Sequence, residues 1–553
     1  MTSAPTASTL HEPASAHTTL PSTAGGVALA QVRSAVTDLH QDGRHVDASE
    51  YALAALAAVL QKSSELELLV AKLRMAGLGK RSERTNAEQL ALLLDELLKQ
   101  APHAVVDPDA EAREDAALTS EIERAETASP TVRRARSSWR TSETVAREIH
   151  THDIPASAKV CVTCGRAQRC IGHDVRQILA YVPARFVVHE HQLQKYACGS
   201  CKDGVITADG PPTVLDQRSA DASLLAQIVV SKFGDHTPLT RLAGIYARSG
   251  VTIAVSTMAD WVAAVADQVA PIAEVLAQRV QRAHVIGTDA TGLRVLDPTS
   301  AAHIQHGTIW CYVGDDRDVV YTYAPTGEGA TGPWDFLRGR TGYVQADAAS
   351  VFDRVYNGDV GNATEVGCWA HARRRMVELQ PTDCRVAYPL QLIARLYRLE
   401  HLADAQHLAP LDRARLRRER SLPVLNKLQH ALARAHLNEP PGSAFAKATR
   451  YVLNHWAALT RFVEDGHLVL DNNGTERQLR AVALGRKNYL FAGSHDAARR
   501  AAVLYSVLRT CAQHGVPPLP YLTDVLRKLG NGVPVTDLVP DRWRTLYGAA
   551  DLP

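Results

Sequence analysis

Two pairs of closely spaced cysteines restrict the possible folds of this chain more than any other feature. Cys161 and Cys164 form one CxxC pair, and Cys198 and Cys201 form the second. Each pair places two thiols on a tight turn, and two such turns can supply the four sulfur ligands of a tetrahedral zinc ion. The sequence between them is rich in Val and aromatic residues and predicts two strands. We therefore expect a zinc ribbon over residues 159–206, with buried unliganded cysteines as the alternative.

A structural zinc site does no chemistry, so the function must be sought elsewhere in the chain. The chain has 553 residues, which indicates roughly three or four domains. No apolar run approaches the roughly 20 residues of a membrane span, and the first 30 residues lack the features of a secretory signal. These observations predict a cytoplasmic protein with no membrane partner. The net charge of +2 means that any nucleic-acid-binding surface must be local.

The N-terminal part divides into three segments by composition. Residues 1–45 are rich in Ser, Thr, Ala and Pro, which predicts disorder. Leucines at three- and four-residue steps predict a helical or coiled-coil arm over residues 46–100. A basic loop interrupts the arm, and it is either a solvated connector or a contact to phosphate. Its charged residues are Lys80, Arg81 and Arg84. Residues 101–158 are polar and predict a linker.

Helical patterns return after the cysteine pairs. Residues 207–281 predict a helical module resembling a helix-turn-helix, in which Thr257 would begin the helix that enters a DNA groove. Packed helices with no special role are the alternative. Residues 387–462 predict a helical insertion, whose arginine-rich run is either a solvated face or a clamp on DNA phosphates. A helical tail is expected over residues 516–553.

Acidic residues interrupt three segments that otherwise look like core. Asp289 lies inside an apolar strand, Asp347 ends a second one, and Glu476 follows a helix-cap sequence. A carboxylate in a buried strand is costly unless a cation or donors compensate it. Three converging carboxylates could hold two divalent cations roughly 4 Å apart, the geometry that catalyses phosphodiester displacement. Taken singly, these acids would be read as ordinary caps and ion pairs.

Seven segments, in order, resemble the transposases of the insertion sequence 66 family over most of the chain from about residue 50. They are GKRSER, the two CxxC pairs with KYAC, DHTPLTRLAGIYARSG through STMADWV, GTDATGLRVL, VQADA, GCWAHARRRM and DNNGTERQLRAVALGRKNYLFAG. The resemblance implies a multidomain α+β fold whose RNase H-like α/β catalytic core spans residues 282–386 and 463–515. It also implies DNA transposition as the activity, with Asp289, Asp347 and Glu476 as the acidic triad. Two magnesium ions are the implied cofactor, and manganese is a possible substitute.

Further site residues follow from the same resemblance. Cys368 and His371 have the spacing that several acidic-triad transposase families show between the second and third acids, which puts His371 beside the active site, with a packed histidine as the alternative. Basic residues around the triad would neutralise DNA phosphates. They are Arg373, Arg374, Arg477, Arg480, Arg486 and Lys487. Ala290 departs from the family, which commonly has an acidic residue there, and this departure is compatible with reduced activity.

The sequence therefore predicts an enzyme that binds the inverted terminal repeats of a mobile element. Water would first attack the phosphodiester at the element end, and the freed 3′ hydroxyl would then attack target DNA. The expected partners are double-stranded DNA, a second copy of the chain and small accessory proteins of the same element, and the bound enzyme would be associated with the nucleoid. Two alternatives remain: a non-enzymatic zinc-ribbon DNA-binding protein with a decayed core, and an RNase H-like nuclease or resolvase that never joins strands.

Overall fold

The computed structural model describes residues 36–41, 49, 107–128, 185–196, 206–207, 214–215 and 220–547, apart from 316, 438 and 441. The chain divides into two compact units, Met1–Gly79 and Lys80–Pro553. In the first unit, the described residues 36–41 are helical. The prediction of disorder over residues 1–45 is therefore wrong for this short helix. Nearly all of the predicted arm, with the basic loop at Lys80, Arg81 and Arg84, lies outside the described residues.

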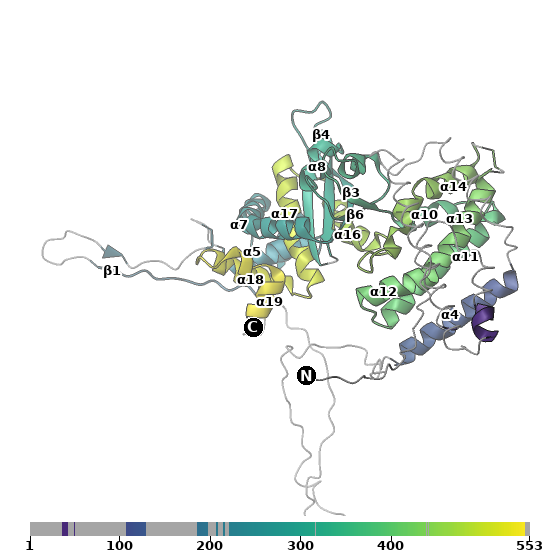
Figure 1. The fold of residues 1–553 in the computed structure, drawn as a ribbon. Helices are drawn as coiled ribbons and strands as arrows, with labels where there is room; N and C mark the ends of the chain where they lie inside the picture. The colour runs from purple at the N-terminus through teal and green to yellow at the C-terminus, as the bar shows by residue number, and fades with distance from the viewer. Residues whose placement is uncertain are drawn as a thin grey trace, which may run out of the picture. The chain divides into compact units, whose positions relative to one another are not determined.

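A mixed five-stranded sheet forms the centre of the second unit (Figure 1), with strand order β5-β4-β3-β6-β7. The strands are β3 (Val285–Leu296), β4 (Ile304–Gly314), β5 (Asp318–Ala324), β6 (Tyr343–Gln345) and β7 (Thr364–Val366). The pairs β3–β4 and β4–β5 are antiparallel, whereas β3–β6 and β6–β7 are parallel. The apolar strands predicted around Asp289 and before Asp347 thus lie next to each other.

Two helices near the C-terminus, α16 (Asn473–Tyr489) and α17 (His495–Gln513), pack on the sheet. Ser506 Oγ accepts a hydrogen bond of 2.8 Å from the backbone N–H of Tyr321 in β5, and the Tyr321 hydroxyl donates to the Gln478 carbonyl of α16 at 2.8 Å. Thr510 Oγ1 both accepts from and donates to the backbone of Val319 at 3.0 Å. Helix α17 therefore satisfies the free backbone groups of the edge strand β5, which would otherwise invite pairing with another chain.

Aromatic side chains cover the opposite face of the sheet. Tyr312 stacks on Phe336 with ring centroids 3.9 Å apart, and Trp310 meets the ring of Phe352 edge-on at 5.9 Å. These residues alternate with Cys311, which faces the other way because side chains alternate along a strand. The covering elements are η3 (Gly329–Thr331), α8 (Pro333–Phe336), η4 (Ser350–Phe352) and α9 (Asp353–Tyr356).

The helical module before the sheet contains a helix–turn–helix sequence of elements. Its elements are α5 (Ala222–Val229), η2 (Val230–Gly234), α6 (Leu239–Arg248) and α7 (Val255–Arg282). Gly250, with φ of +83°, makes the turn between the last two helices. Helix α7 begins at Val255, two residues before the predicted start at Thr257, and Ala254 before it provides no side-chain cap. Thr257 lies in its first turn and is half-buried.

Residues 369–463 form a second, helical core. It comprises α10 (Trp369–Val377), η5 (Cys384–Val386), α11 (Ala387–Ala405), α12 (Pro410–Leu416), η6 (Arg417–Ser421), α13 (Leu422–Leu437), α14 (Ala444–Asn454), α15 (Trp456–Thr460) and η7 (Arg461–Val463). Buried Ile393, Leu396, Leu428 and Val452 belong to one apolar cluster with Trp369. The helices over 387–462 agree with the predicted periodicity. The C-terminal tail is also helical, with α18 (Pro518–Leu529), η8 (Val535–Asp537) and α19 (Pro540–Tyr547).

The arginine-rich run of this helical core is largely engaged within the protein. Arg417 is fully buried, with its guanidinium 2.6 Å from Glu400, and Arg413 pairs with the same carboxylate at 3.0 Å. Arg415 pairs with Asp412 at 2.6 Å, and Arg420 with Glu121 at 2.8 Å. Arg413 and Arg417 therefore serve packing, whereas Arg415 and Arg418 are exposed.

The predicted linker over residues 101–158 contains a 21-residue helix, α4 (Pro108–Ala128), so the prediction is wrong for this segment. The acidic helix packs on α11. Arg395 of α11 is almost completely buried and lies 2.7 Å from Glu111 and 2.6 Å from both Glu114 and Asp115. Hydrogen bonds from Lys427 and Arg395 lower the pKa of Glu111 despite burial. The pKa of Asp115 likewise falls to about 2, because Arg395, Gln391 and Arg398 donate hydrogen bonds to it.

The predicted zinc ribbon is described only in part. Its four cysteines lie outside the described residues. Strands β1 (Lys195–Tyr196) and β2 (Ile206–Thr207) pair antiparallel, whereas residues 185–194 have no regular structure and are mostly exposed. The longer strands predicted between the cysteine pairs are therefore absent from residues 185–194, where Val187 and Val188 find no core to cover them.

Candidate active site

Two of the three predicted acids lie at corresponding register positions of neighbouring segments, one inside β3 and the other just after β6. Gly287 of β3 is paired with Gln345 of β6 in the parallel register. Asp289 lies two residues beyond the first of this pair, and Asp347 lies two residues beyond the second. Because strand side chains repeat every second residue, Asp289 shares a sheet face with Gly287. Asp289 thus lies inside β3, and Asp347 follows the end of the neighbouring strand β6 at the corresponding register position.

The third acid arrives because a glycine lets a helix approach the sheet. A Cβ atom at Gly287 would lie 2.3 Å from Thr475 Oγ1 and 3.0 Å from Asn472 Oδ1, so only glycine permits this approach. Asn472, immediately before α16, donates from Nδ2 to the Thr288 carbonyl at 2.8 Å. Glu476 belongs to the first turn of α16. These contacts fix the beginning of α16 beside Asp289 and bring Glu476 to the same place.

The pKa of Asp289 reflects the proximity of the three carboxylates. This pKa is raised from the ordinary 3.8 to about 6, chiefly by burial and in addition by the negative charges of Asp347 and Glu476. A hydrogen bond of 2.7 Å from the Ala290 N–H and the nearby His371 act in the opposite direction. Charges shift a pKa in this way only at short range, so the three carboxylates form one electrostatic cluster. The positive charge near them does not offset their negative charge.

His371 also reaches this cluster. It lies on α10, with Nε2 3.8 Å from Glu476 Oε1, and Arg374 Nη2 is 4.0 Å from the second oxygen of the same carboxylate. Cys368, just before α10, accepts a hydrogen bond from the Asn472 N–H at 3.2 Å. The CxxH sequence therefore packs the start of α10 against the start of α16, and His371 faces the third acid.

A divalent cation fits the chemistry of these donors. Glu476 Oε1 and His371 Nδ1 are buried, and neither has a hydrogen-bond partner within the described part of the chain. Carboxylate oxygens are the ligands that magnesium and manganese prefer. Ligand atoms of Cys368, His371 and Glu476 lie within 4.8 Å of one another, but burial raises the pKa of the Cys368 thiol and so disfavours the thiolate that would bind metal. The oxygen-rich acids are thus the better place for the cation.

The basic residues predicted to contact DNA differ in their exposure and in the contacts that they make within the protein. Arg373, Arg374, Arg477, Arg480 and Lys487 are exposed. Arg486 is instead partly buried and donates to Thr291 Oγ1 at 2.8 Å and to the Gly292 carbonyl, which ties the end of α16 to β3. Its guanidinium is therefore largely committed to the fold.

Comparison with known proteins decides the family. A sequence model described as the transposase of the IS66 family matches residues 217–500, and one for the zinc-finger binding domain of IS66 transposases matches residues 158–202. The chain belongs to the IS66 transposase family. The family resemblance predicted from the sequence is confirmed, and with it a DNA-binding transposase of an insertion sequence.

Relatives of this IS66 transposase come from Sinorhizobium fredii (strain NBRC 101917 / NGR234). Uncharacterized protein y4hP is 30% identical over 511 residues, which cover 88% of this chain and 89% of the relative. Uncharacterized protein y4qI is 32% identical over 406 residues, covering 71% and 74%. The similarity therefore extends well beyond the sheet and its acids.

The zinc-finger match spans all four of Cys161, Cys164, Cys198 and Cys201 and supports a structural zinc in this IS66 transposase. Family membership likewise indicates use of a divalent metal. Among the helices of the described segments, none is long and apolar enough to cross a membrane.

Two residues that position the site were not predicted from the sequence. Gly287 and Asn472 bring α16 onto β3, although neither is acidic or basic. A glycine inside an otherwise apolar strand was a usable signal, because such glycines often mark the close approach of another segment.

Proposed function

We propose that this IS66 transposase binds the inverted terminal repeats of its element and catalyses DNA cleavage and strand transfer at Asp289, Asp347 and Glu476. The observation that supports the proposal is the placement of Asp289 inside β3 and of Asp347 just beyond the end of the neighbouring β6, with α16 bringing Glu476 to them. A sheet that is antiparallel on one side of β3 and parallel on the other supports an RNase H-like core.

The three carboxylates would hold magnesium, or manganese in its place. When bound, this metal would activate the attacking group and neutralise charge on the phosphodiester. Asp289 and Asp347 would supply its principal ligands, because one lies inside β3 and the other just beyond the end of the neighbouring β6. Glu476 would supply a further ligand, since its Oε1 accepts no hydrogen bond from the described residues.

His371 would act as a positioning residue. Its ring, 3.8 Å from Glu476, limits the orientations open to that carboxylate and partly offsets the negative charge around Asp289. The exposed Arg477, Arg480 and Lys487 would neutralise phosphates of the DNA, which gives affinity without base specificity. Sequence recognition would fall to the helices α6 and α7 and to the zinc finger, and a dimer would form through the N-terminal arm.

An assay with plasmid-borne element ends tests this proposal. Wild-type protein with magnesium is expected to yield both cleaved ends and joined products, and Asp347→Asn is expected to lose at least 10³-fold in rate, because the metal ligands and the stabilisation they provide are lost. Asp335→Asn, an exposed acid outside the cluster, is the control.

Each alternative function has its own signature in that assay. Equal products from the wild type and Asp347→Asn would contradict the catalytic assignment and favour a DNA-binding protein with a decayed core. Cleaved but never joined DNA would favour a nuclease or resolvase.

A further inference from the structure

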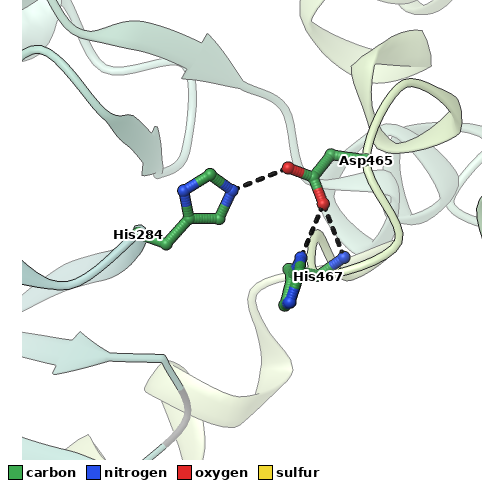
Figure 2. A group of neighbouring side chains, drawn as sticks. All are labelled: His284, Asp465 and His467. Atoms are coloured by element: carbon green, nitrogen blue, oxygen red, sulfur yellow. Dashed lines mark hydrogen bonds and ion pairs between the residues drawn. The ribbon is translucent and has the colours of Figure 1, made fainter. Parts of the chain in front are cut away.

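A second group of potential metal ligands lies outside the acidic cluster (Figure 2). His284 immediately precedes β3, whereas Asp465 and His467 lie in the segment after η7 that leads to α16. His284 Nε2 is 2.6 Å from Asp465 Oδ2, and His467 Nδ1 is 2.9 Å from Asp465 Oδ1. Ligand atoms of all three side chains lie within 4.8 Å of one another, although 181 residues separate His284 from Asp465.

The buried guanidinium of Arg417 holds the segment that carries two of these ligands. Arg417 Nη1 donates to the carbonyls of Phe462 and Asp465 at 2.7 and 2.9 Å, and Nη2 donates to the Leu468 carbonyl at 2.8 Å. The His467 N–H adds a hydrogen bond of 2.9 Å to Asp465 Oδ1. The loop is therefore pinned at both ends, and Asp465 and His467 keep a fixed relation.

His284 is fixed just as firmly from the sheet. Its backbone N–H donates to Asp315 Oδ2 at 3.1 Å, and its carbonyl accepts from Arg340 Nη2 at 2.7 Å and from the Tyr343 N–H at 3.2 Å. The imidazole meets the Tyr343 ring edge-on at 5.2 Å. Preorganised ligands of this kind bind metal well because little freedom is lost on binding.

We propose that His284, Asp465 and His467 form a metal site that takes a divalent transition metal of the zinc class. Two imidazole nitrogens and one carboxylate oxygen suit zinc, cobalt or nickel, whereas magnesium prefers oxygen alone. Zinc bonds of 2.0–2.2 Å separate tetrahedral ligands by about 3.3 Å. The present contacts of 2.6 and 2.9 Å need to widen by about 0.7 and 0.4 Å to reach this spacing, which the half-exposed imidazoles allow.

This site is distinct from the acidic cluster and does not rest on the proposed function. His284 precedes Asp289 by five residues, or about 16 Å of extended strand. Metal bound here would fasten β3 to the segment that runs from the helical core into α16. It would therefore join two parts of the molecule that are far apart in sequence.

Zinc counting on the full chain tests the proposal. Chelator-treated protein is dialysed against zinc in millimolar magnesium, which occupies the acidic cluster, and bound zinc per chain is measured. Wild type is expected to bind one zinc more than His467→Ala or His284→Ala, since the zinc finger contributes equally to all variants. His306→Ala, an exposed histidine on β4, is the matched control and should bind as wild type does.

Equal zinc counts in wild type and both histidine variants would overturn the proposal. Circular dichroism shows whether the variants fold. If either does not, Asp465→Asn decides, because it keeps the shape of the side chain. We expect it to bind the extra zinc at least tenfold more weakly, and unchanged affinity would contradict the site.

Discussion

Asp289 is the residue at which charge and burial conflict most directly. Its pKa of about 6 exceeds the ordinary 3.8, so its ionisation is less favourable in the folded than in the unfolded chain. The stability that this shift provides is complete below about pH 4 and is lost as the pH rises through about 6. At pH 7.5 the metal-free protein is destabilised by up to about 3 kcal/mol.

We therefore expect Asp289→Asn to raise the melting temperature of the metal-free protein at pH 7.5 and to have little effect at pH 4. Calorimetry across this range, in chelator, measures the difference. Asp260→Asn, an exposed acid on α7, is the control and should change little at either pH. An equal rise in melting temperature at both pH values would contradict the raised pKa of Asp289.

Gly287 determines how closely α16 approaches β3. Gly287→Ala should destabilise the protein by about 1–3 kcal/mol, because the new methyl group would overlap Thr475 Oγ1. Chemical denaturation measures this loss. Gly292→Ala on the same strand is the matched control, since its Cβ would meet its nearest neighbour at an ordinary 4.0 Å. Adding Thr475→Ala should recover part of the stability, and a failure to recover any would point to a different cause.

Among single residues, the sequence predicted the three acids but not the residues that position them. Asp289, Asp347 and Glu476 stand out because charged residues interrupt apolar patterns. Gly287 and Asn472 act through contacts between segments 184 residues apart, which no local pattern contains.

Among the elements, the arginine-rich run shows that a run of charged residues in the sequence is not always a solvent-exposed surface. Arg417 of η6 is wholly buried and satisfies Glu400 and three carbonyls, while Arg415, two residues earlier, is exposed. Arg417→Met is expected to lower the free energy of unfolding by about 3–5 kcal/mol, because it leaves Glu400 and the carbonyls without their donor.

Arg415→Met is the control for this prediction, and a change within about 0.5 kcal/mol is expected because exposed ion pairs contribute little. Urea denaturation of both variants makes the comparison. Similar losses in both would mean that the run acts as one charged surface.

The sequence did not predict helix α4, because its few apolar residues do not form a recognisable helical pattern. Leu118 and Ile122 are its buried apolar residues, and most of its remaining contacts are ion pairs with Arg395, Lys427 and Arg420. Those partners lie some 280 to 316 residues away. By contrast, the strands around Asp289 and before Asp347 and the helices of 387–462 carry their own periodicity, which made them predictable from the sequence.

For the whole molecule, the exposed cations of α16 predict how DNA binding responds to salt. Replacing Arg480 with Gln should weaken binding to element ends and to unrelated duplex alike, and should reduce the slope of log K against log salt by about one. Fluorescence anisotropy at several salt concentrations measures both effects. Arg338→Gln, an exposed arginine paired with Asp335, is the control. A loss confined to element ends would instead assign base recognition to Arg480.

The distance in sequence between the acids has a consequence for protein synthesis. The ribosome adds Asp289 and Asp347 before the helical core, but it adds Glu476 only after the whole of that core. On the proposed function, a ribosome that stalls before codon 476 releases a polypeptide with two acids and no third. Incomplete products of this gene would then be unable to cut the chromosome of their host.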